Sequence, residues 1–134
     1  DMKEAVLYYN PGNAPKPGMM KSVLVRMGVR IKNVTEEQLG ETIGTLLGIP
    51  EIKSEKERED GSKHERKGPL EEQILVLYRF SENRLDQLLY GLRKAGVPKI
   101  ELKAVVTEQN SQWTMYELYE ELKKEREALT GAND

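Results

Sequence analysis

Residues 74–80 read Ile-Leu-Val-Leu-Tyr-Arg-Phe, the longest near-continuous run of strand-forming residues in the chain. The centre of this run, Val76-Leu77-Tyr78, repeats the tripeptide Val6-Leu7-Tyr8 near the N-terminus. Both runs are apolar on both faces, which is typical of strands in the middle of a sheet. We therefore expect the two runs to form neighbouring central strands.

Further matches follow the two tripeptides in the same order, and each half of the chain reads strand, helix, strand, helix. Met27-Gly28-Val29 aligns with Ala95-Gly96-Val97, and the segment from Ile31 to Glu36 aligns with that from Leu102 to Glu108 after one insertion. This order predicts an internal duplication, with repeats at 1–50 and 72–129 in a single domain. Similarity forced by shared strand and helix patterns is the alternative.

Alternating strands and helices predict an α/β fold with a mostly parallel four-stranded sheet and helices on both faces. The segments 29–34 and 99–106 alternate apolar and polar residues, as half-buried edge strands do. Placing them outside the two central strands gives the strand order 2-1-3-4. The alternative is a ferredoxin-like α+β arrangement.

Helix signals lie between these strands. Pro17 suits the first turn of a helix that Gly28 ends, and Ser81 is placed to cap a helix that Gly96 ends. Thr35 and Gln38 form a capping box ahead of a helix whose apolar stripe is Leu39, Ile43, Leu46 and Leu47. For the last helix we expect Asn110 or Ser111 as the N-cap.

Between the repeats, eleven of the fifteen residues from 53 to 67 are charged. Such a segment buries too little apolar surface to offset its ordering entropy, so we expect 51–71 to be a flexible connection. His64, the only histidine, lies there without a second metal-ligating histidine or cysteine. The sequence therefore predicts no metal site and no cofactor.

Composition excludes several classes of protein. The chain has 134 residues, a formal charge of −2 and no cysteine, which rules out thiol catalysis and cysteine-ligated zinc. No apolar run approaches the ~20 residues of a membrane span. We expect a cytoplasmic protein that does not bind membranes.

Six polar residues follow the two central strands. In doubly wound sheets, ligands bind beyond the carboxyl ends of the strands where the strand order reverses. Here that rule points to the loops after the first and third strands, next to a helix N-terminus that could hold an anion. The candidate ligand-binding residues are Asn10, Gly12, Asn13, Arg79, Ser81 and Asn83. Ordinary turn and capping chemistry also explains each of them.

A second candidate is the polar stretch 107–113, which contains the only tryptophan. Thr107, Asn110 and Trp113 would form a partner contact if the indole were exposed, whereas a buried indole would only fix the last helix to the sheet. A third candidate is the basic set between Tyr9 and Thr35, which contains no acidic residue: Lys16, Lys21, Arg26, Arg30 and Lys32. These residues could hold a phosphate-bearing partner or could simply be a solvated edge.

The second half resembles an uncharacterised bacterial "domain of unknown function" family, most strongly over residues 74–122. The resemblance rests on Leu75-Val76-Leu77, Arg84-Leu85-Asp86, Ala95-Gly96-Val97, Leu102-Lys103-Ala104-Val105-Val106-Thr107 with Asn110 and Trp113, and Leu118-Tyr119-Glu120-Glu121-Leu122. The segment 25–32 looks like the N-terminal region of the same proteins. The resemblance implies no activity.

No catalytic signature is present, so the sequence favours a small, soluble binding or regulatory module with a protein partner or small ligand. One alternative is an enzyme with its site at the carboxyl ends of the first and third strands. The other alternative is a nucleic-acid accessory protein that uses the Lys16–Lys32 surface, which the acidic net charge disfavours.

Overall fold

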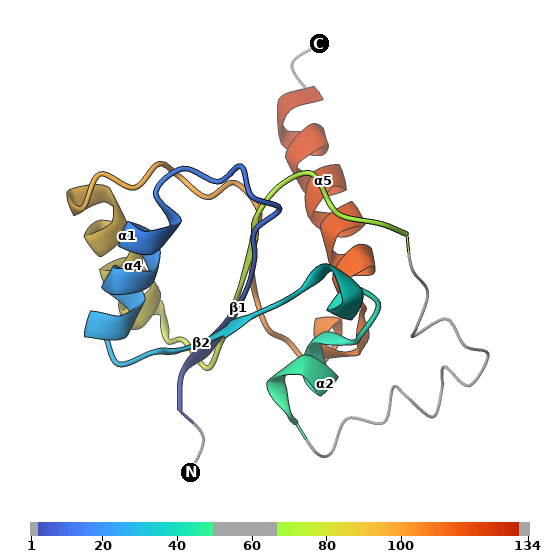
Figure 1. Cartoon of the computed structure of the whole chain (residues 1–134), viewed down its shortest axis with the longest axis horizontal. Helices are drawn as coiled ribbons and strands as arrows, with labels where there is room; N and C mark the ends of the chain where they lie inside the picture. The colour runs from blue at the N-terminus through green and yellow to red at the C-terminus, as the bar shows by residue number, and fades with distance from the viewer. Residues whose placement is uncertain (1–2, 50–66, 132–134) are drawn as a thin grey trace. The chain divides into compact units, whose positions relative to one another are not determined.

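The computed structural model of the protein describes residues 3–49 and 67–131 (Figure 1). Its elements follow the alternating order expected from the sequence. They are β1 (Ala5–Tyr9), α1 (Pro17–Arg26), β2 (Arg30–Asn33), η1 (Glu36–Gln38), α2 (Ile43–Leu47), β3 (Ile74–Tyr78), α4 (Glu82–Lys94), β4 (Lys103–Val105), η3 (Asn110–Gln112) and α5 (Met115–Gly131). None of the helices in these described ranges is long and apolar enough to cross a membrane.

The chain forms two compact units. The first unit is made of the described residues of Asp1–Val34 and Glu71–Val106, and the second is made of those of Thr35–Leu70 and Thr107–Asp134. Each unit therefore draws on both predicted repeats. The assignment of the whole chain to a single duplicated domain stays a prediction.

The first unit contains a four-stranded sheet of order β2-β1-β3-β4, which confirms the predicted order and the α/β class. Every residue of β3 except Tyr78 is buried, and in β1 only Ala5 is partly exposed. The edge strands β2 and β4 have no buried residue. The apolar character of the two central runs therefore indicated their position correctly.

The sheet is mixed. β1 pairs with β2 and β3 with β4 in parallel, but the central pair is antiparallel, with Ala5 opposite Tyr78 and Tyr9 opposite Ile74. The expectation that the carboxyl ends of β1 and β3 meet is therefore wrong. The crossover rule fixes direction only within each βαβ unit. Between β2 and β3 the chain also contains η1 and α2, so no single crossover dictates how the two βαβ units are oriented.

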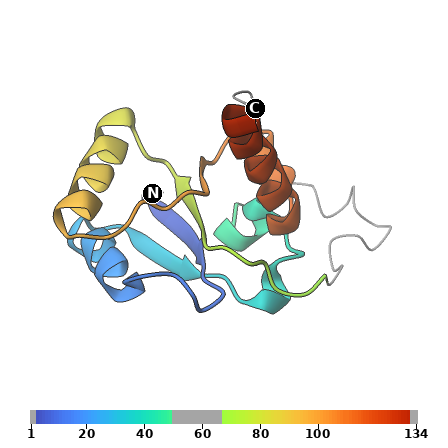
Figure 2. The same cartoon turned by 90° about the horizontal axis from the view of Figure 1, so that it is seen from above.

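Helices α1 and α4 lie side by side on one face of this sheet (Figures 1 and 2). Their buried side chains meet those of the sheet in one apolar core, made of Val6, Tyr8, Met20, Val23, Leu24, Val29, Leu75, Leu77, Leu88, Leu92, Val97 and Ile100. On the opposite face of the strands, Leu7 and Val76 are also fully buried. The placement of helices on that second face stays a prediction.

Both helices end in the same way. Gly28 and Gly96 have φ values of 79° and 78°, a left-handed conformation that glycine adopts without steric cost. The next residue closes the helix in each case: Val29 N–H donates to Leu24 O at 3.0 Å, and Val97 N–H donates to Leu92 O at 2.9 Å. These are Schellman-type ends, as the two glycines predicted.

The connections after the two glycines differ in length. β2 begins at Arg30, two residues after Gly28, whereas β4 begins at Lys103, seven residues after Gly96. The predicted strand 99–106 is therefore too long at its N-terminal end. Residues 97–102 instead form a loop in which Ile100 and Leu102 are buried.

In the second unit, residues 35–47 do not form the single helix that the sequence predicted. The capping box is present, with Thr35 N–H donating to Gln38 Oε1 at 3.0 Å, but it opens only the short 3-10 helix η1. Thr42 caps a separate helix, α2, by accepting from Thr45 N–H at 3.1 Å. A glycine at position 40 and a second N-cap at Thr42 explain the break. Leu39 and Ile43 are buried as the stripe predicted.

Helix α5 begins later than expected. Asn110 and Ser111 belong to η3, and the residue that caps α5 is Thr114, which exchanges two hydrogen bonds with Glu117, at 2.9 and 3.1 Å. A single antiparallel bridge joins Thr42 to Thr114, one residue before the start of each helix. Both parts of this unit thus have the same sequence of 3-10 helix, capping threonine and α-helix.

Of the charged segment 51–71, the structure describes residues 67–71, and His64 lies outside the described residues. Leu70 is buried, Lys67 N–H donates to the Tyr116 hydroxyl at 3.0 Å, and that hydroxyl donates to Gly68 O at 2.7 Å. These last residues therefore pack in the second unit through Tyr116 of α5.

Candidate functional site

The six residues predicted to form one ligand site are not brought together. Because β1 and β3 are antiparallel, the loop after Tyr9 and the loop after Tyr78 leave the sheet at opposite ends. Three of the six candidates lie at each end. Their roles as ligand-binding residues stay predictions, but they cannot act as one site at a shared strand edge.

The residues after β1 make turn contacts. Asn10 Oδ1 accepts from Gly12 N–H at 2.8 Å and from Ala14 N–H at 3.3 Å. Asn13 Nδ2 donates to Glu71 O at 3.1 Å, which ties this turn to the segment preceding β3. Turn formation, the second explanation that the sequence allowed, accounts for these contacts.

The residues after β3 begin helix α4. Ser81 Oγ accepts from Arg84 N–H at 3.1 Å, as expected for an N-cap, and Arg79 has a left-handed φ of 66°. The side chain of Arg84 makes two bonds to the Glu4 carboxylate, at 2.7 and 2.8 Å, and one to Met27 O at 2.6 Å. This end of the sheet is thus occupied by an internal ion pair.

The proposed partner contact at 107–113 is held by local bonds. Thr107 N–H donates to Asn110 Oδ1 at 2.9 Å, and Asn110 N–H donates to Thr107 Oγ1 at 3.0 Å. Asn110 is buried, Thr107 is exposed, and Trp113 is half-buried. The Trp113 carbonyl also accepts from Ile43 N–H at 2.9 Å. A partner contact here stays a prediction.

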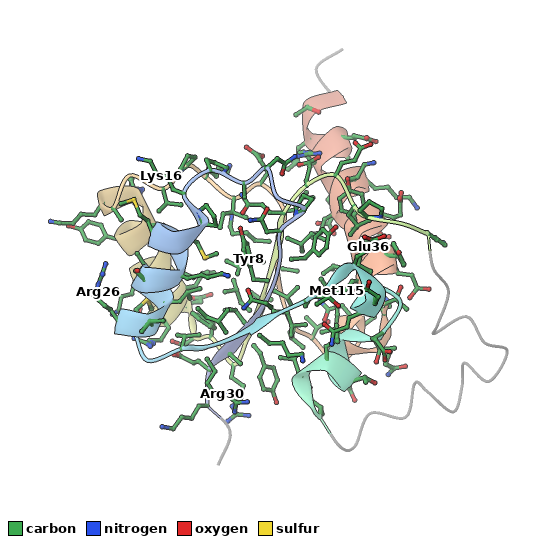
Figure 3. The ribbon with its side chains drawn as sticks, viewed as in Figure 1. Tyr8, Lys16, Arg26, Arg30, Glu36 and Met115 are labelled. Carbon is green, nitrogen blue, oxygen red and sulfur yellow. The ribbon has the colours of Figure 1, made fainter. Side chains whose placement is uncertain are left out.

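The basic residues between Tyr9 and Thr35 are spread along the first βαβ unit. Figure 3 shows Lys16 and Arg26 at opposite ends of α1, with Arg30 beyond the second end. Lys21 lies over the ring of buried Tyr8, with its Nζ 5.6 Å from the ring centre. The set therefore does not form one compact cationic site.

A pocket of about 310 Å³ lies between the C-terminal half of α4 and the loop that leads to β4. Neither the loops after β1 and β3 nor the basic residues from Lys16 to Lys32 contribute to it. The lining residues are Leu89, Leu92, Arg93, Val97, Pro98, Lys99, Ile100 and Lys103. Leu92, Val97 and Ile100 are 2–7 % exposed, so the apolar part of the lining is an extension of the core.

The charged part of the lining is entirely cationic. Arg93 and Lys99 are exposed, Lys103 is half-buried, and none of the lining residues, all in the described part of the chain, is a carboxylate. Lys103 Nζ donates to Ile100 O at 2.7 Å. Burial lowers the pKa of Lys103 and the charge of Lys99 lowers it further, while Glu101 acts in the opposite direction.

Sequence reasoning missed this pocket because residues 99–106 have the alternation of a strand. If residues 99–106 formed a strand, Lys99 and Lys103 would lie on the face opposite Ile100 and Leu102 and would not line a cavity. The feature that indicates the pocket is the difference in length between the connection from α1 to β2 and the connection from α4 to β4. Gly28 is followed almost at once by β2, whereas six residues, 97–102, separate Gly96 from β4. No group of three or more potential metal ligands occurs among the described residues.

Comparison with known families gives one match. Residues 73–129 match the family model described as "Domain of unknown function (DUF3783)". This confirms the resemblance to a domain-of-unknown-function family, which was strongest over 74–122. The matched segment extends from β3 into α5 and includes every residue that lines the pocket. No curated protein and no solved structure matches the chain.

Proposed function

Because the segment that matches the family contains the whole pocket, we propose that this chain is a binding module whose site is that pocket. Its ligand is a small molecule with an apolar body and one anionic group. The observation that carries the proposal is a pocket with an apolar floor and only cationic charged residues in its lining.

The size and floor of the pocket define the body of the ligand. A volume of about 310 Å³ is at the lower end of the range for ligand sites. At roughly 30 Å³ per water-sized group, it holds a molecule of about ten non-hydrogen atoms. Leu89, Leu92 and Ile100 offer this molecule apolar contacts, which favours an aromatic ring or a short hydrocarbon chain.

The charges define the head of the ligand. Arg93, Lys99 and Lys103 place three cationic groups around one cavity. The charge of Lys99 lowers the pKa of Lys103, as repulsion between like charges does. A carboxylate or phosphate bound among them would relieve that repulsion and form charge-assisted hydrogen bonds. The planar Arg93 guanidinium is suited to two parallel bonds with a carboxylate.

The fold itself does not need this pocket. In the first βαβ unit, the chain passes from Gly28 to β2 with only Val29 between them. The longer connection in the second βαβ unit, between α4 and β4, adds Pro98, Lys99 and Ile100 to the pocket lining. Since a shorter connection closes the same kind of βαβ unit, the exposed extra residues Pro98 and Lys99 are available for binding.

Calorimetric titration with hydrocinnamate, an aromatic carboxylate of suitable size, tests this proposal. We expect binding that weakens for the neutral amide of the same compound. Lys99→Ala should weaken it about five- to tenfold, since one exposed charge-assisted contact contributes about 1–1.4 kcal/mol. Lys94→Ala is the matched control, because Lys94 belongs to the same cationic helix end but does not line the pocket.

Two results would overturn the proposal. One is the absence of binding at millimolar hydrocinnamate, and the other is an equal loss of affinity for Lys94→Ala and Lys99→Ala. The second result would show that the ligand responds to general positive charge near α4. The cytoplasmic location, the enzyme and the nucleic-acid alternatives stay predictions, and the spread of the basic residues along α1 does not favour the last.

A further inference from the structure

Among the three cations of the pocket, Lys103 differs from the other two. Arg93 and Lys99 are exposed, whereas Lys103 is half-buried on the edge strand β4, where it is paired with Leu75. Its Nζ is held at 2.7 Å from Ile100 O, so the amine is fixed at the lining of the cavity. The pocket thus contains one half-buried primary amine and two exposed cations.

We propose that Lys103 is a reactive amine that forms a reversible imine with small α-keto acids bearing an apolar side chain. This inference rests on the proposed binding function of the same pocket and names a class of ligand for it. The apolar side chain occupies the floor formed by Leu92 and Ile100. The carboxylate pairs with Arg93 and Lys99, which directs the adjacent keto carbon towards Lys103.

The reaction needs nothing beyond the amine and the ligand. The lone pair of neutral Nζ attacks the keto carbon, and the carbonyl π electrons move to the oxygen. Both amine protons then leave with that oxygen as water, and a carbon–nitrogen double bond remains. No electrons are gained or lost overall, and water reverses the reaction.

The surroundings of Lys103 increase the fraction of the neutral form that this step requires. Burial lowers the pKa of Lys103 and the neighbouring Lys99 charge adds to the effect, although Glu101 opposes it. A desolvated lysine next to another cation is a recognised arrangement for an amine nucleophile. The hydrogen bond from Lys103 Nζ to Ile100 O is compatible with a neutral amine, because neutral Nζ still carries two protons that it can donate.

Other lysines provide the comparison within the same chain. Lys94 Nζ lies 5.8 Å from the centre of the exposed Tyr90 ring, outside the pocket lining. Lys99 lines the pocket but is exposed. If pocket geometry governs reactivity, both should react far less than Lys103.

Borohydride trapping tests the inference on the full chain. The protein is incubated with phenylpyruvate, reduced, digested and mapped by mass spectrometry. We expect at least about tenfold more reduced adduct on Lys103 than on Lys94 or any other lysine, because binding raises the local keto concentration. Excess hydrocinnamate should suppress that adduct. Lys103→Arg should abolish the adduct, whereas Lys94→Arg should leave the adduct unchanged.

The two proposals fail in different ways. Hydrocinnamate binding without an adduct on Lys103, or with adducts spread evenly over the lysines, would overturn the imine proposal and leave the binding site intact. Absence of hydrocinnamate binding would overturn the binding function itself. The site map on the unmodified chain decides the first question even if Lys103→Arg does not fold.

Discussion

The close approach of α1 and α4 gives a sharp test of how the first unit is packed. Gly91 lies on α4 at a point where a Cβ atom would stand 3.0 Å from Val23 Cγ1 of α1. Carbon atoms pack best at about 3.5–4.0 Å, so an added methyl group would be about 0.5 Å too close. Val23 is only 4 % exposed and belongs to the core, which limits its freedom to move away.

Two opposing terms set the effect of Gly91→Ala on the free energy of unfolding. Alanine in a helix is favoured over glycine by about 1 kcal/mol, whereas overfilling a core costs about 1–3 kcal/mol. The net expectation is a destabilisation of about 0–2 kcal/mol. In a Val23→Ala background the clashing Cγ1 is absent, so the same change should stabilise the protein by about 1 kcal/mol.

Urea denaturation of the four proteins in this double-mutant cycle measures the coupling between the two positions. We expect a coupling energy of about 1–3 kcal/mol. A control cycle pairs Gly91→Ala with Val25→Ala, because Val25 lies on the same helix but is 64 % exposed. The control cycle should be additive. Additivity in both cycles would refute the inferred contact between α1 and α4.

Three further predictions concern other features. Gly28→Ala and Gly96→Ala should each lower the free energy of unfolding in urea by about 1 kcal/mol, because both positions have positive φ. Steric overlap does not contribute, since neither added Cβ meets an atom closer than 3.6 Å. A neutral effect would argue against the left-handed helix ends. Tyr116→Phe should cost about 1 kcal/mol, since it removes the hydroxyl that bonds Lys67 N–H and Gly68 O. Burial lowers the pKa of Lys103, so between that pKa and the unfolded value of about 10.4 the unfolded chain binds more protons. Stability should therefore rise with pH across that window, and Lys103→Met should remove this part of the slope.

The position of each strand in the sheet could be predicted from the sequence, because a strand buried on both faces consists almost entirely of apolar residues. The runs containing Val6 and Val76 are continuous and apolar, and they form the centre of the sheet. The ends of α1 and α4 were also readable, because glycine at positions 28 and 96 is the residue that a left-handed helix end favours.

Strand direction and the pocket could not be predicted in the same way. The direction of β3 relative to β1 depends on contacts between two βαβ units, and alternation within one strand carries no information about it. The loop 97–102 looked like a strand because Ile100 and Leu102 alternate with charged residues. Both side chains are buried in the loop as they would be in a strand, so the pattern could not separate the two.

The proposed function requires that the pocket between α4 and β4 binds an amphipathic anion. Backbone amide NMR shifts during a hydrocinnamate titration test it most directly, because they locate the ligand without any substitution. We expect saturable shifts concentrated at Leu89, Val97, Ile100 and Lys103, with little change at Asn10 to Asn13 or Arg79 to Asn83. The proposed binding site would be contradicted if the largest shifts occurred in the loops after β1 or β3, or if no saturable shift occurred around α4 and β4.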